Sequence, residues 1–187
     1  MSDTHPIAAV DETSAPIPAN ARALLGALHS FNEAKNAAQV GELRTVHELC
    51  LAYDTVDEDA FGEAAERLTS YGAHGTPQVA EFLSLEISAL LGTSPASGAC
   101  LIGEVLNCVY RHPVMWDAVQ VGAVRWHRAS EVIGLVNAAG LPLDAAQWVD
   151  RRIAPLLVTL PRARALRKLK GLIAIAAPEL ARERIHR

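Results

Sequence analysis

The sequence lacks the features of a membrane or secreted protein. No apolar run approaches the roughly 18 residues of a membrane span, and the N-terminus, "MSDTHPIAAVDETSAPIPAN", has no basic region followed by an apolar stretch. The three cysteines, Cys50, Cys100 and Cys108, are an odd number, which suggests reduced thiols rather than disulfides. We therefore expect a soluble, cytoplasmic chain with no membrane partner.

Strand signals are also nearly absent. Alternating polar and β-branched runs are missing, and the nearest candidate, "LLVTL", is short and lies between prolines. A chain of 187 residues, half of them apolar, is the size of one domain with its own core. We predict an all-α fold, a single multi-helix orthogonal bundle over residues 20–177. A disordered tail, 1–19, precedes it and a C-terminal tail, 178–187, follows it.

The apolar spacing predicts where the helices lie. A long N-terminal helix, or a helix pair broken near Gly41, is expected from Asn20. Ser94 with Pro95 predicts a capped helix start, Gly92 a helix end, and Pro113 an end or a kink. The remaining helices are expected at about 57–70, 76–91, 94–112, 114–120, 125–139, 142–154 and 160–177.

The sequence contains no complete catalytic or metal-binding motif. It has no G-x-S-x-G, no glycine-rich phosphate loop after a strand, and no H-E-x-x-H. Cys100, Glu104, Cys108 and His112 are spaced by four on one predicted helix, but three such steps cover about 18 Å and cannot meet at one ion. We expect no metal, no cofactor and no catalytic residue, which favours a non-catalytic protein but leaves enzyme activity open.

The stretch "EISALLGTSPASGACLIGEV" has the outline of a helix-turn-helix. A reading of DNA bases would need Arg, Lys, Asn or Gln at the start of the second helix. That helix begins instead with small residues, Pro95 to Ala99. Close packing of the two helices is the better interpretation.

Charge divides the chain into an acidic and a basic part. Residues 1–104 hold 15 acidic and 4 basic side chains, whereas residues 105–187 hold 6 and 13. This asymmetry indicates either an anionic partner for the second part or pairing between the two parts, within a chain or between copies.

Two helices of the second part carry the basic residues. In "PRARALRKLKGLIAIAAP" the apolar residues share one face and the basic residues occupy the rest. In "RHPVMWDAVQVGAVRWHRASEVIGL" the tryptophans belong to a core, His127, Arg128 and Glu131 face away, and Arg125 and Arg128 are available to a partner. The residues of the predicted contact surface are Arg125, Arg128, Arg151, Arg152, Arg162, Arg164, Arg167, Lys168 and Lys170.

The order of these segments resembles the domain-of-unknown-function 222 family of high-GC bacteria, in which such helices precede an HNH endonuclease domain. The likeness runs from about Val40 to Ile185. It rests on positions such as Trp116, Gly122, Trp126, Ala129, Trp148, Val149 and Pro155. Family members commonly continue into a nuclease module, whereas this chain stops at "PELARERIHR". The resemblance therefore implies a DNA context but carries no catalytic residue onto this chain.

Three hypotheses follow. The first is a non-catalytic helical module that assists DNA association, with its basic second half on the phosphate backbone and a separate nuclease domain as a further partner. The second is a protein-interaction or homo-oligomerisation module without a nucleic-acid role, in which the long first helix pairs with another chain. The third is the remnant of a truncated nuclease.

Overall fold

The computed structural model describes residues 19–53 and 66–176. These described residues fall into two compact units, one that ends at Lys35 and one that begins at Asn36. Apart from Ala19, the predicted N-terminal tail lies outside the described residues, as does the C-terminal tail.

The first helix, α1, runs from Ala19 to Ala52 without a break. Gly41 does not interrupt it, so the alternative of a helix pair was wrong and the single long helix is confirmed. In the second unit α1 buries Val40, Leu43 and Val46, which recur every three residues on one side of the helix.

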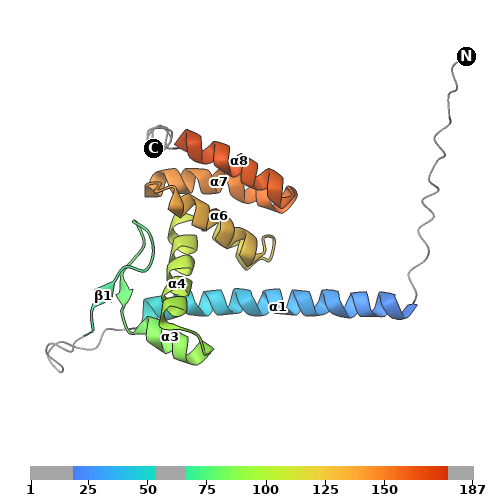
Figure 1. The fold of residues 1–187 in the computed structure, drawn as a ribbon, viewed down its shortest axis with the longest axis horizontal. Helices are drawn as coiled ribbons and strands as arrows, with labels where there is room; N and C mark the ends of the chain where they lie inside the picture. The colour runs from blue at the N-terminus through green and yellow to red at the C-terminus, as the bar shows by residue number, and fades with distance from the viewer. Residues whose placement is uncertain (1–18, 54–65, 177–187) are drawn as a thin grey trace, which may run out of the picture. The chain divides into compact units, whose positions relative to one another are not determined.

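The second unit contains all the other elements that the structure describes (Figure 1). The α-helices are α3 (Leu83–Leu91), α4 (Pro95–Leu106), α5 (Pro113–Gln120), α6 (Trp126–Ala138), α7 (Leu143–Thr159) and α8 (Arg162–Ala176), and a π-helical turn, η2 (Asn107–Arg111), continues α4. These helices confirm the all-α bundle with a long N-terminal helix.

A short antiparallel ribbon is the main departure from the prediction. Strand β1 (Leu68–Thr69) pairs with β2 (Val79–Ala80). Strand β1 lies where the helix predicted at 57–70 was expected to end, and β2 lies where the helix predicted at 76–91 was expected to begin. Residues 54–65 lie outside the description, so the start of the helix predicted at 57–70 is not tested, but its end was wrong. The helix predicted from 76 begins only at Leu83, because Val79 and Ala80 form β2 and pair with β1 instead.

Helix α7 is longer than predicted. It continues through Pro155 to Thr159 and includes "LLVT", which was the nearest strand candidate. The buried residues Ile153, Ala154 and Leu157 maintain the helical spacing across the proline. The burial of these side chains therefore keeps α7 helical, although Pro155 has no N–H group to donate a helical hydrogen bond.

Helices α3 and α4 pack closely against each other. Gly92, in the left-handed conformation (φ 63°), ends α3, and the Ser94 side chain accepts a hydrogen bond from the Ser97 N–H at the start of α4. A Cβ at Gly98 would overlap both the Ser84 carbonyl oxygen and Ser88 Oγ. The small residues at the start of α4 thus serve helix packing, as the sequence indicated.

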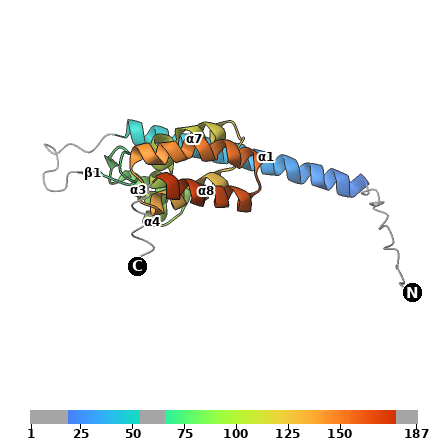
Figure 2. The same ribbon diagram turned by 90° about the horizontal axis from the view of Figure 1, so that it is seen from above.

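Helices α7 and α8 lie side by side in both ribbon views (Figures 1 and 2). Helix α6 also contacts α8 and buries Trp126, Ala129, Val132, Ile133 and Val136 in the core. The prediction that Trp126 is a packing residue is confirmed.

Among the described residues, no single helix has the length and apolar character to cross a membrane. Only when taken together do Leu83–Leu91 and Pro95–Arg111 reach that length and composition, and they are bent by 111° relative to each other.

Candidate functional site

The exposed side of α8 is the most basic surface among the predicted sites. Ala165 and Leu169 are buried and Leu166 is half-buried, so this side of the helix holds α8 to the core. The side chains of Arg164, Arg167, Lys168 and Lys170 are exposed. The separation of an apolar from a basic face, predicted from the sequence, is confirmed.

Three of these basic residues surround a hollow in the surface. Arg164, Arg167 and Lys168, together with Leu160, line a hollow of about 400 Å³. Arg167 and Lys168 follow Arg164 by three and four positions, so both lie one helical turn from it on the same side of α8. We call Arg164, Arg167, Lys168 and the neighbouring Lys170 the α8 basic face.

The α8 basic face is not neutralised by acidic side chains of the described part of the chain. Arg162, the first residue of α8, differs: its guanidinium forms a bidentate ion pair with Glu131 of α6. Hydrogen bonds and charge attraction from Glu131 raise the pKa of Arg162. Arg162 therefore joins α8 to α6, whereas residues 164–170 present their charge outwards.

The structure gives Arg128 a structural role rather than the free position predicted for it. Its Nη2 donates a hydrogen bond to the Leu160 carbonyl oxygen at 2.8 Å and its side chain is half-buried. Glu131, three positions further along α6, forms its ion pair with Arg162 of α8. Arg125 is half-buried at the start of α6.

Helix α7 contributes two exposed arginines, Arg151 and Arg152. The Arg152 guanidinium lies 3.8 Å from the centroid of the Trp148 ring and donates to the Trp148 carbonyl oxygen at 3.2 Å. This cation–π contact restricts the side chain without neutralising its charge. The spacing of four between Trp148 and Arg152 is the signal by which the sequence could have predicted it.

A buried polar cluster, not predicted from the sequence, lies between η2 and α7. The fully buried Arg111 donates to the carbonyl oxygens of His74 and Leu141, the second at 2.7 Å. Asp150 accepts the N–H groups of Val114 at 2.8 Å and Met115 at 3.1 Å, and so caps the first turn of α5. We call Arg111, His112 and Asp150 the buried polar cluster.

His112 is completely buried, and its Nδ1 lies 3.9 Å from Asp150 Oδ1. Burial, with a smaller contribution from Arg111, lowers its pKa to about 4. Burial also raises the pKa of Asp150 to about 6, against the opposing effect of its two backbone hydrogen bonds. A side chain with no exposed surface cannot reach a substrate, so His112 is not placed for catalysis.

The described cysteines do not form a reactive site. Burial raises the pKa of the Cys50 thiol to about 11 and also raises that of Cys108, which is fully buried. Cys100 is exposed, 4.0 Å from a Glu104 carboxylate oxygen. Within residues 19–53 and 66–176, no group of three or more His, Cys, Asp or Glu side chains is arranged to hold a metal ion.

Comparisons with protein-family models, with curated proteins and with solved structures found no match to this chain.

Proposed function

We propose that the chain is a non-catalytic module that associates with DNA through the phosphate backbone, and that the α8 basic face makes the contact. The observation that carries this proposal is the exposed hollow lined by Arg164, Arg167 and Lys168. Phosphate oxygens are the acceptors that arginine and lysine side chains contact most often in protein–DNA complexes.

The geometry favours contact with the backbone rather than with bases. Arg164 and Lys168 are one helical turn apart, about 6 Å along the axis, which matches about two phosphates of one strand. The sequence of α8 contains no Asn or Gln, so this helix lacks the side chains that pair with adenine. If its arginines and lysines contact phosphates, as we propose, binding should depend little on DNA sequence.

The resemblance to the domain-of-unknown-function 222 family supports the same proposal, because its helices accompany an HNH nuclease. By that resemblance a separate nuclease domain would supply the cleavage, and this chain would supply part of the affinity. A role of this kind also implies a cytoplasmic location.

Charge reversal with a matched control tests the proposal. The variant Arg167→Glu, Lys168→Glu should weaken binding of a duplex of about 20 base pairs by more than about tenfold at roughly 50 mM salt, measured by fluorescence anisotropy. The control, Arg22→Glu, Arg67→Glu, makes the same change in net charge at two exposed positions outside the α8 basic face and should bind nearly as wild type.

Two results would contradict the proposal. One is equal weakening in the variant and its control, which would mean that net charge alone determines binding. The other is unchanged binding together with a lower melting temperature or an altered oligomer size in the α8 variant. That outcome would favour pairing between the basic and the acidic part of the chain.

A further inference from the structure

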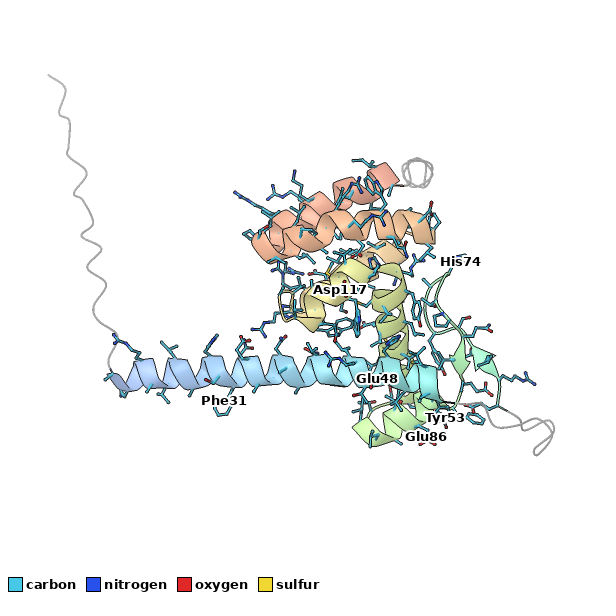
Figure 3. All side chains as sticks on the ribbon, turned by 180° about the vertical axis from the view of Figure 1, so that it is seen from behind. Phe31, Glu48, Tyr53, His74, Glu86 and Asp117 are labelled. Carbon is cyan, nitrogen blue, oxygen red and sulfur yellow. The ribbon has the colours of Figure 1, made fainter. Side chains whose placement is uncertain are left out.

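The first half of α1 exposes large apolar side chains close together. In the unit that ends at Lys35, Leu24, Leu28 and Phe31 are 70%, 65% and 72% exposed, and Leu25 is also more than half exposed. Single exposed apolar residues are common on protein surfaces, but four within eight positions of one helix are a continuous patch. Figure 3 shows the Phe31 side chain projecting from α1.

The spacing of these residues fits contact with another helix. Leu24, Leu28 and Phe31 are separated by four and then three positions, which places them in one narrow stripe along the helix. We call these three residues the α1 seam. Alternation of four and three is the pattern by which helices pack in a coiled coil.

The charges of this half of α1 favour a second copy over other occupants. Arg22, Lys35 and Glu33 are of mixed sign, so two copies repel each other only weakly. A helix that binds a membrane surface carries many lysines or arginines opposite its apolar side. Here that side holds a single arginine, Arg22, together with Glu33 and Ser30, so it is not strongly basic.

We propose that the α1 seam is a self-association surface, in which Leu24, Leu28 and Phe31 of one chain pack against the same residues of a second copy. A symmetric pair uses one patch on both chains, so no other partner is needed to cover it. The small residues Ala21, Ala27 and Ala34 lie among the seam residues and let the two helices approach closely.

The area of the apolar patch on α1 determines how strong the self-association should be. Three seam residues and Leu25, at roughly 100 Å² each, supply on the order of 800 Å² in a pair of chains. Stable interfaces bury about 1,200 Å² or more. The self-association should therefore be reversible, with a monomer at low concentration and a dimer at high concentration.

Sedimentation equilibrium of the full chain tests this inference. The wild-type mass should rise from that of a monomer to that of a dimer between about 1 and 200 μM, the range of a weak interface. The variant Leu28→Ala, Phe31→Ala should remain monomeric. Alanine favours the helix, so the circular dichroism of the variant should match that of the wild type.

A matched control removes exposed leucines elsewhere. The variant Leu51→Ala, Leu90→Ala truncates side chains that are 63% and 82% exposed and do not belong to the seam, and it should dimerise as wild type does. A wild-type chain that is monomeric throughout, or a seam variant that dimerises normally, would overturn the proposal. Seam-dependent binding of the monomer to phosphatidylserine vesicles would overturn it in favour of a membrane surface.

Discussion

At the scale of single residues, the buried polar cluster is what fixes the centre of the second unit. Arg111 holds the loop at His74 and the segment just before α7, at Leu141, by donating to their carbonyl oxygens. Asp150 holds the start of α5. Each of these groups is costly to bury without partners, so the hydrogen bonds specify how the helices meet.

The two titrating members of the cluster should have opposite effects on stability as pH changes. Asp150 has a raised pKa, about 6 against 3.8, so its contribution is greatest below pH 3.8 and is lost as the pH rises through 6. His112 has a lowered pKa, about 4 against 6.5, so its contribution is present above pH 6.5 and is lost as the pH falls through 4. In the wild type the two contributions largely cancel.

Single substitutions should separate these contributions. In Asp150→Asn, only the His112 contribution remains, and the free energy of unfolding should fall relative to wild type by about 3 kcal/mol from pH 6.5 to pH 4. In His112→Asn, the difference from wild type should have the opposite slope. Urea unfolding followed by circular dichroism at several pH values measures both. Parallel pH profiles of all three proteins would contradict the assignment.

At the scale of elements, the contact between α3 and α4 depends on a glycine. Because a Cβ at Gly98 would overlap the Ser84 carbonyl and Ser88 Oγ, the two helices approach too closely for any other residue. Ser88 uses its hydroxyl to bond the carbonyl oxygens of Ser84, at 2.6 Å, and Ser94, at 3.0 Å. Ser88 of α3 thus stabilises both the turn before α4 and the contact between the two helices.

Gly98→Ala should therefore destabilise the second unit by about 1–3 kcal/mol through forced separation of α3 and α4. Gly134→Ala is the matched control, because Gly134 lies inside α6 and an added Cβ there would meet no atom within 4 Å. That control should be neutral or stabilise by up to about 1 kcal/mol, since alanine favours a helix. Thermal unfolding distinguishes them, and equal melting temperatures would show that the contact tolerates a methyl group.

The elements also show which features a sequence can predict. Helix existence, the Ser94 cap and the Gly92 end follow from local chemistry, and they are confirmed. The pairing of Leu68 with Ala80 is a contact across twelve positions between two short segments without alternation, so no local pattern indicates it. Pro155 alone indicates a helix end, but α7 continues beyond it because Leu157 is buried in the core.

At the scale of the whole molecule, the division of charge in the sequence predicted a basic surface but not which residues form it. The apolar spacing of α8 was enough to identify Arg164, Arg167 and Lys168 as exposed. It could not show that Arg162 pairs with Glu131 or that Arg128 bonds the Leu160 carbonyl. Both are contacts between segments about 30 positions apart, which only the packing of α6 against α8 and the turn before it determines.

The salt dependence of DNA binding is the most direct test of the central claim that the α8 basic face contacts phosphates. If three or four of its side chains do so, log affinity for a duplex should fall linearly against log salt concentration with a slope of about −2.7 to −3.6. The variant Arg167→Glu, Lys168→Glu should flatten that slope by about two units. No binding by the wild type at roughly 50 mM salt, where such contacts are strong, would contradict the claim.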